Sequence, residues 1–138
     1  MRWFYVPNEG KEGDQIGPRM AFEKLHRDGV FSDYLAYSYL VRQIVLRNHQ
    51  AALNEFLETA SDFSPDIIFI QHPGNGYPMD RAYLQQLKSI PSRPKLVLFE
   101  ADPYGQLIKR MDATLKAVIA ETDVCYFKAG FSQYAVFK

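Results

Sequence analysis

The chain has 138 residues, of which 47% are hydrophobic and 23% charged, and its 16 basic and 16 acidic side chains cancel to a net charge of zero. This composition is typical of a globular domain, and a neutral chain without a basic run is poorly suited to bind nucleic acid or an anionic membrane. The single cysteine, Cys125, excludes an internal disulfide and a thiolate zinc site, and no apolar run approaches the roughly 20 residues that cross a bilayer. We therefore expect a cytoplasmic protein without a membrane span, without a nucleic-acid partner and without a cofactor.

The N-terminal half of the sequence predicts two strands, each followed by a helix. The predicted elements are a strand at 2–6, a helix at 18–29, a strand at 31–39 and a helix at 41–60. The strands are rich in aromatic and β-branched residues, whereas Pro18 and Gly29 suit the two ends of the first helix. In the second helix, helical spacing places Val45 in the same buried row as Ala52 and Phe56.

The C-terminal half continues this alternation. The predicted elements are a strand at 67–70, a short helix capped by Asp80, a strand at 96–99, a helix at 107–119 and a strand at 124–127. Each of these strands is a continuous apolar run, which is typical of parallel strands that are covered on both faces. Residues 132–138 are predicted to form either another helix or an irregular tail.

Alternation of strands and helices predicts a parallel sheet with helices on both faces. We expect a single domain over 1–138, a three-layer α/β/α, Rossmann-like domain with a five-stranded, mainly parallel sheet. The three continuous apolar strands are expected at or near the centre of that sheet. The pattern leaves open whether the strand order is Rossmann-like or flavodoxin-like.

Candidate functional residues are sought in the loops that follow the strands, because parallel sheets bind ligands beyond the carboxyl ends of their strands. The first such loop carries Gly10 and Gly13 ahead of a helix whose first turn holds Arg19, an arrangement that can face an anion. The glycine spacing matches neither the dinucleotide fingerprint nor the phosphate-binding P-loop, so a plain flexible loop and a solvated Arg19 are the competing interpretation. After the third strand, His72 and Asn75 are candidates for hydrogen bonds to a ligand, with a structural role for His72 as the alternative.

The loop after the fourth strand contains two carboxylates, Glu100 and Asp102, separated by one residue. Close carboxylates can raise one pKa and so serve general acid–base catalysis, and both are predicted to be catalytic. Asp102 precedes a proline and can equally be the cap of the next helix, which makes Glu100 the stronger candidate. No metal site is predicted, because the three histidines fall on different elements.

Several stretches resemble a known family of enzymes. They are Phe4-Tyr5-Val6-Pro7-Asn8 with the glycine loop and Arg19, Ser64-Pro65-Asp66-Ile67-Ile68-Phe69, the run from Pro94 to Gly105, and Thr122-Asp123-Val124-Cys125-Tyr126-Phe127. Together they resemble the N-terminal half of a GT-B glycosyltransferase, in particular the CgeB-like (spore maturation protein) group.

This resemblance implies an acceptor-binding domain of an enzyme that transfers sugar from a nucleotide-sugar donor. The sugar or glycosylated acceptor would lie against Asn8, Gly10, Gly13, Arg19, His72, Asn75 and Tyr104, with Glu100 and Asp102 at the reacting centre. The donor would bind a C-terminal domain that these 138 residues lack. The chain alone is therefore expected to be inactive.

Two other functions are considered. The first is a non-catalytic α/β module that binds a protein partner or a small ligand. The second is a receiver-like signalling domain, which needs an acidic pair after the first strand and an aspartate at the end of the third. Asn8 and Glu9 stand at the first position and Gln71 and His72 at the second, so the phosphoacceptor is missing, although Lys128 after the fifth strand fits.

Overall fold

The computed structural model describes residues 1–73, 78–101 and 111–127. In chain order the elements are β1 (Arg2–Val6), α1 (Ile16–Arg27), β2 (Asp33–Ala36), α2 (Tyr39–Leu46), α3 (His49–Phe63), β3 (Ile67–Gln71), α4 (Arg81–Lys88), β4 (Lys95–Glu100), α5 (Ala113–Glu121) and β5 (Val124–Phe127). Among these described residues, none of the helices is both long and apolar enough to span a membrane.

The five strands form one parallel sheet in the order β2-β1-β3-β4-β5. This is the flavodoxin-like order, and it differs from the 3-2-1-4-5-6 order of a dinucleotide-binding Rossmann domain. The predicted fold class, a three-layer α/β/α domain with a five-stranded parallel sheet, is therefore confirmed, and the strand order that the sequence left open is settled.

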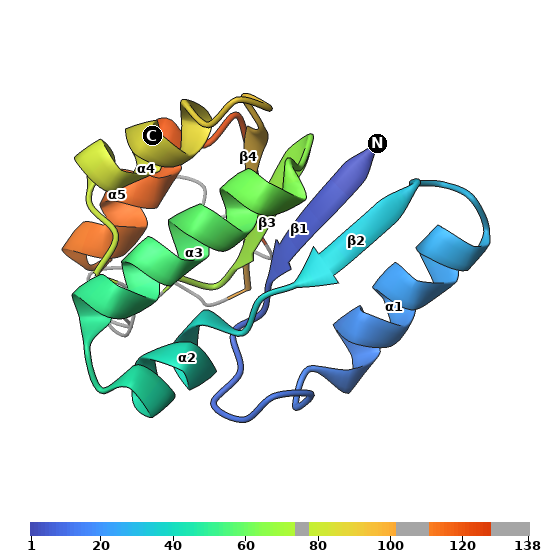
Figure 1. The fold of residues 1–138 in the computed structure, drawn as a ribbon, viewed down its shortest axis with the longest axis horizontal. Helices are drawn as coiled ribbons and strands as arrows, with labels where there is room; N and C mark the ends of the chain where they lie inside the picture. Colours follow the sequence, from blue (N-terminus) through green and yellow to red (C-terminus); the bar gives the residue numbers. More distant parts are fainter. Residues whose placement is uncertain (74–77, 102–110, 128–138) are drawn as a thin grey trace.

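The helices cover the two faces of the sheet unequally. Figure 1 shows α3, α4 and α5 gathered on one side, whereas α1 lies apart from them beside β2. The larger core lies under the first group and includes the fully buried Phe4, Phe56, Ile68 and Leu98. The smaller core lies under α1, where Phe22 stacks on Tyr5 with ring centroids 4.5 Å apart. Since successive side chains of a strand point to opposite faces, Phe4 and Tyr5 serve different cores.

The predicted helix at 41–60 is two helices in the structure. Arg47 adopts a left-handed conformation with φ of 50°, which ends α2, and the side chain of Asn48 accepts a hydrogen bond from the backbone of Ala51 at the start of α3. The break changes the helical phase, because residues on either side no longer share one axis. As a result Ala52 and Phe56 are fully buried as predicted, but Val45 is 60% exposed.

The last strand is also placed differently from the prediction. Among the described residues, β5 pairs only with β4 and forms an edge of the sheet, and its residues Val124 and Tyr126 are exposed. The helix predicted at 107–119 is α5, which begins at Ala113 behind the N-cap Asp112. Residues 102–110 and 132–138, on which the rest of that helix and the predicted tail depend, lie outside the described residues.

Candidate functional site

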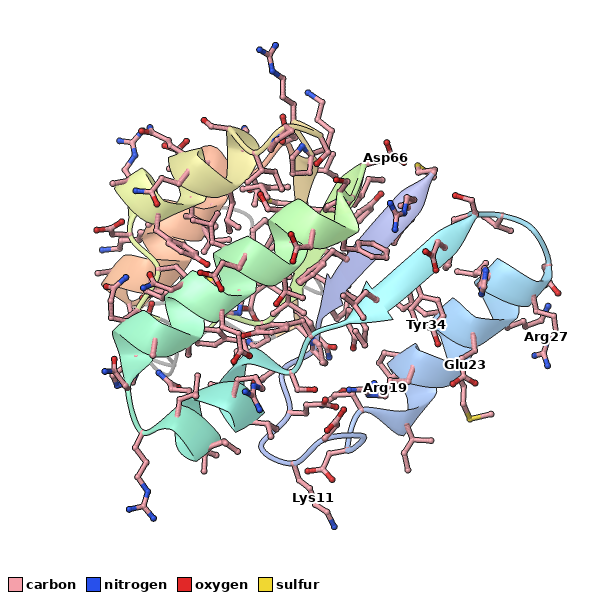
Figure 2. All side chains as sticks on the ribbon, viewed as in Figure 1. Lys11, Arg19, Glu23, Arg27, Tyr34 and Asp66 are labelled. Atoms are coloured by element: carbon pink, nitrogen blue, oxygen red, sulfur yellow. The ribbon has the colours of Figure 1, made fainter. Side chains whose placement is uncertain are left out.

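The carboxyl ends of β1, β2, β3 and β4 meet at one edge of the sheet, which we call the carboxyl edge. The loop 7–15 and helix α2 lie at this edge, beyond the ends of β1 and β2 (Figure 1). In Figure 2, Lys11 marks the loop and Asp66 marks the opposite end of the sheet. The candidate site is built from polar side chains that these strand ends bring together.

Glu9, in the loop that follows β1, is the buried centre of one polar cluster. Its side chain is completely inaccessible to solvent and forms an ion pair with Arg19 of α1. The Arg19 Nε atom donates to Glu9 Oε2 over 3.2 Å, and a second guanidinium nitrogen donates to Oε1. Ser38, which precedes α2, donates its hydroxyl to the same carboxylate and accepts from Arg19 Nη2 over 3.0 Å. One carboxylate thus ties together β1, α1 and the start of α2.

The electrostatics of this cluster favour a charged Glu9. Burial alone would raise the pKa of Glu9, but the hydrogen bonds from Arg19 and Ser38 and the one from the backbone of Gln15 outweigh it and hold the pKa below its ordinary value. The pKa of Arg19 is raised, chiefly because its guanidinium donates to Glu9. Both groups are therefore ionised near neutral pH, and they neutralise each other.

A chain of amides continues from this cluster toward the centre of the sheet. The Gln15 side chain donates to the backbone oxygen of Asn8 over 2.8 Å and accepts from Gln71 Nε2 over 3.2 Å. The hydroxyl of Tyr5 donates to the Gln71 side-chain oxygen. Burial raises the pKa of Tyr5, so this phenol stays protonated and acts as the donor. The ends of β1 and β3 are in this way linked through the loop 7–15.

A second pair of side chains joins the ends of β3 and β4. His72 Nδ1 lies 2.6 Å from Glu100 Oε1, and the Glu100 side chain is fully buried. His72 has φ of 45°, a left-handed conformation that a residue with a Cβ adopts rarely, and its backbone N–H donates to the carbonyl of Phe99. A buried carboxylate against one ring nitrogen fixes the orientation of a histidine, as in many hydrogen-bonded dyads.

The structure brings some of the predicted site residues together and leaves others apart. Arg19 turns from α1 toward the loop 7–15 (Figure 2) and is occupied by Glu9 and Ser38. Gly10 and Gly13 lie in that loop, Gly13 with φ of 88°, and Asn8 contributes its backbone oxygen to Gln15. His72 and Glu100, predicted from separate loops, form one pair. The predicted residues Asn75, Asp102 and Tyr104 lie outside the described residues.

Five residues of these clusters were not predicted as site residues, namely Tyr5, Glu9, Gln15, Ser38 and Gln71. Glu9 and Gln71 were weighed only at the two positions where a receiver-like domain needs acidic residues, and Ser38 and Gln15 were not singled out. A signal was present for Gln71, because a polar residue directly after the apolar run 67–70 falls at the carboxyl end of a buried strand. The partners of Glu9 could not be read from the sequence, because Ser38 is 29 positions away along the chain.

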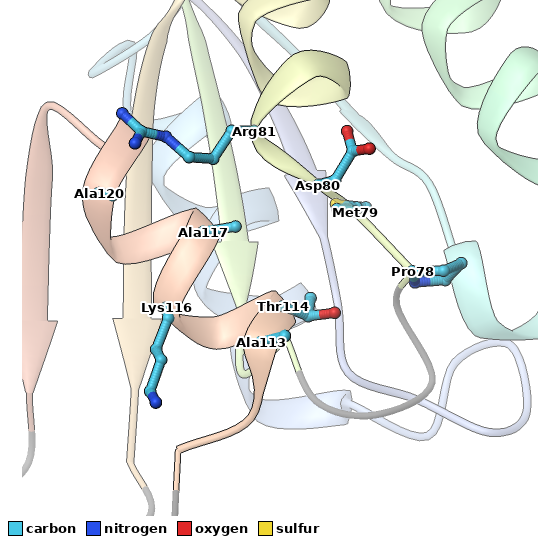
Figure 3. Close-up of a pocket in the computed structure, with 9 residues that line it drawn as sticks. All are labelled: Pro78, Met79, Asp80, Arg81, Ala113, Thr114, Lys116, Ala117 and Ala120. Atoms are coloured by element: carbon cyan, nitrogen blue, oxygen red, sulfur yellow. The ribbon is translucent and has the colours of Figure 1, made fainter.

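A separate cavity of about 620 Å³ opens between α4 and α5 (Figure 3). Its wall is largely apolar and includes Met79, Ala113 and Ala117, with Arg81 and Lys116 as cations. Arg81 Nε donates to Glu121 over 2.8 Å, which neutralises one of the two. Within the described part of the chain, no cluster of three or more histidine, cysteine or acidic side chains is arranged to hold a metal ion.

Comparison with known proteins gives a match in structure only. No family model matches the chain, and no curated protein matches it in sequence. The fold is similar to the crystal structure of a CheY-like protein, TadZ, from Pseudomonas aeruginosa PAO1, with a TM-score of 0.53 and 10% sequence identity. The match covers 99% of this chain and 93% of that chain. At this identity the similarity shows the fold alone.

This comparison overturns the resemblance to a GT-B glycosyltransferase of the CgeB-like group. The flavodoxin-like strand order and the CheY-like neighbour give no support to the acceptor-binding half of a two-domain transferase. The predicted transferase function, the sugar acceptor and the nucleotide-sugar donor are therefore wrong. Short fragments such as a Pro-Asp pair before an apolar strand occur in many parallel sheets, so their presence did not identify the glycosyltransferase family.

Proposed function

We propose that this chain is a non-catalytic protein-interaction module with a CheY-like fold that acts in the cytoplasm. The observation that carries the proposal is the mutual pairing of polar side chains at the carboxyl edge. Glu9 is bound by Arg19 and Ser38, and Gln71 by Tyr5 and Gln15. A reactive site directs charged groups at a substrate, whereas these groups bind one another.

The end of β3 supports the same conclusion. A receiver-like domain would need an aspartate there to accept a phosphoryl group. This chain instead has the amide of Gln71 and the imidazole of His72 at that place. The acidic residue nearest the end of β1, Glu9, is neutralised by Arg19 and so is not available to hold a cation. In this proposal Glu100 orients His72, and the carboxyl edge fixes the loop 7–15 and α2 in position.

The proposal is tested by looking for both chemistry and partners. The purified chain is incubated with acetyl phosphate and Mg²⁺, alongside an active receiver domain as the control, and intact masses are compared. We expect the mass of one added phosphoryl group in the control and an unchanged mass in this chain. We also expect the chain to co-purify with one protein of its source cells in a stoichiometric complex that re-forms from purified components. A phosphoryl adduct, or the lack of any such complex, would contradict the proposal.

A small ligand is the second candidate partner, because the cavity between α4 and α5 has the volume of many ligand sites. Ala117 lies in its wall, so Ala117→Trp would fill it (Figure 3). If the module binds a small apolar ligand there, metabolite extracts should raise the Tm of the wild-type chain and not that of Ala117→Trp. An equal response of the two proteins would remove this candidate.

A further inference from the structure

Helix α2 presents an aliphatic stripe to solvent. Its eight residues place Val41, Ile44 and Val45 at the i, i+3, i+4 spacing that normally marks a buried face. Ile44 and Val45 are nevertheless 64% and 60% exposed, whereas Tyr39 is fully buried and Gln43 turns inward toward it. The side chains of Ile44 and Val45 therefore point away from the core and Val41 beside them is half-buried, while Tyr39, Leu40 and Leu46 pack against the core.

The fold does not require the exposed face of this helix, because α2 reaches the larger core through Tyr39, Leu40 and Leu46. A connection between parallel strands needs one helix, and α3 already covers the sheet between β2 and β3. The left-handed Arg47 and the cap formed by Asn48 separate α2 from α3 and leave Val45 outside the core. An exposed aliphatic stripe that the fold neither buries nor needs is typical of an interaction site.

Helix α2 is also held rigidly. Arg42 donates to both oxygens of Glu55 on α3, over 2.6 and 2.7 Å, and Glu55 accepts from the hydroxyl of Tyr37 over 3.0 Å. At its start, Ser38 belongs to the buried Glu9 cluster. A surface held in place before binding loses little conformational entropy when a partner docks.

The charges around the stripe indicate the chemistry of the partner. Residues 34–54 contain no aspartate or glutamate. Arg42 is neutralised by Glu55 and also interacts electrostatically with Glu12 of the loop 7–15. Arg47 is exposed, and its guanidinium makes no ion pair or hydrogen bond with any residue in the described ranges. The exposed stripe therefore ends at a cation that has not been neutralised.

We propose that Val41, Ile44, Val45 and Arg47 form a docking surface for an acidic amphipathic helix of a partner protein. The apolar side of such a helix would cover the stripe, and its carboxylates would meet Arg47. A second copy of this chain is a poorer occupant, because symmetric pairing would bring the two Arg47 side chains into one interface. This inference rests on the proposed function, since it names the surface through which the module binds.

The direct test uses a synthetic helical peptide with leucine at i, i+3, i+4 positions and glutamate elsewhere, labelled for fluorescence anisotropy. A matched peptide with lysine in place of glutamate is the control. We expect the acidic peptide to bind at least about tenfold more tightly than the basic one, and added salt to weaken it. Equal binding of the two peptides, or tighter binding of the basic one, would overturn the proposal.

Variants then locate the surface. Ile44→Ser/Val45→Ser should raise the Kd of the acidic peptide about tenfold or more, and Arg47→Glu should raise it severalfold. The matched control is Ile16→Ser/Met20→Ser on α1, where two side chains with 65% and 62% exposure lie one turn apart. All four side chains are exposed, and circular dichroism checks that each variant is folded. An effect of the α1 pair as large as that of the α2 pair would contradict the assignment.

Two further measurements separate this inference from the proposed function. If the cellular partner binds the α2 variants as tightly as wild type, the docking surface is wrong and the interaction module stands. If the α2 variants lose the partner and the α1 control keeps it, both proposals are supported. Phosphatidylserine vesicles are tested in sedimentation, and vesicle binding that depends on Ile44, Val45 and Arg47 would replace the protein partner with a membrane.

Discussion

At the scale of single residues, Glu9 has the most concentrated set of contacts at the carboxyl edge. Glu9→Gln keeps the shape of the side chain but removes the charge that Arg19 and Ser38 bind. We expect a loss of about 2–3 kcal/mol in the free energy of unfolding, less than for a fully buried ion pair because Arg19 is partly exposed. Urea denaturation measures the loss, and Glu12→Gln on the exposed part of the same loop should change stability by less than about 0.5 kcal/mol.

The same carboxylate predicts how stability depends on pH. Because the pKa of Glu9 is lowered in the folded chain, the unfolded chain takes up its proton first as the pH falls. The contribution of Glu9 is therefore complete above the ordinary carboxyl pKa and is lost as the pH falls through the folded value. Urea denaturation between pH 7 and pH 3 should show a smaller loss on acidification in Glu9→Gln than in wild type. Parallel profiles for the two proteins would show that Glu9 does not contribute.

The candidate site could be predicted from the sequence only in part. Position after a strand was enough to select His72 and Glu100, and their meeting follows from the adjacency of β3 and β4. The role of Arg19 was not predictable, since its partner Glu9 precedes it in a loop whose path no periodic pattern describes. The sequence therefore left Arg19 either facing an anion or solvated, and it did not indicate the buried pair with Glu9.

At the scale of elements, the break between α2 and α3 makes Asn48 a structural cap. Its side-chain oxygen accepts from the backbone N–H of Ala51 over 3.1 Å, which satisfies one of the free donors of the first turn. Asn48→Ala should lower the free energy of unfolding by about 1 kcal/mol, and Asn48→Asp should preserve it. Urea denaturation gives both values. Asn54→Ala, an exposed position within α3, is the control, and an equally large loss there would refute the capping role.

The same break shows where helix prediction from periodicity fails. Helical spacing correctly identified the buried row of α3, including Ala52 and Phe56, because the residues of one continuous helix share one axis and those spaced by about one turn lie on the same face. It placed Val45 in that row because the left-handed conformation of Arg47 has no counterpart in a pattern of hydrophobic residues. A polar residue that is a good helix cap, such as Asn48, was the available signal.

At the scale of the whole molecule, the number, type and direction of the strands could be predicted, but their order could not. Continuous apolar runs indicated coverage on both faces and placed the strands at 67–70 and 96–99 correctly inside the sheet. The run at 124–127 is equally apolar, but it forms an edge strand. The position of a strand in the sheet depends on the side of the preceding strand to which each connection crosses, and the apolar run does not indicate that side. β1 itself lies inside the sheet, between β2 and β3.

This order predicts how protection from hydrogen exchange is distributed over the molecule. β1, β3 and β4 have a neighbouring strand on each side, and the larger core packs against all three. In the part of the chain that the structure describes, β2 and β5 each pair on one side only. We expect the slowest amides in the three inner strands, exchanging at a rate near that of global unfolding. Amides of the two edge strands should exchange through smaller openings and therefore faster. Native-state exchange read by NMR gives the order, and protection of β5 equal to that of β3 would mean that the edge of the sheet is covered in solution.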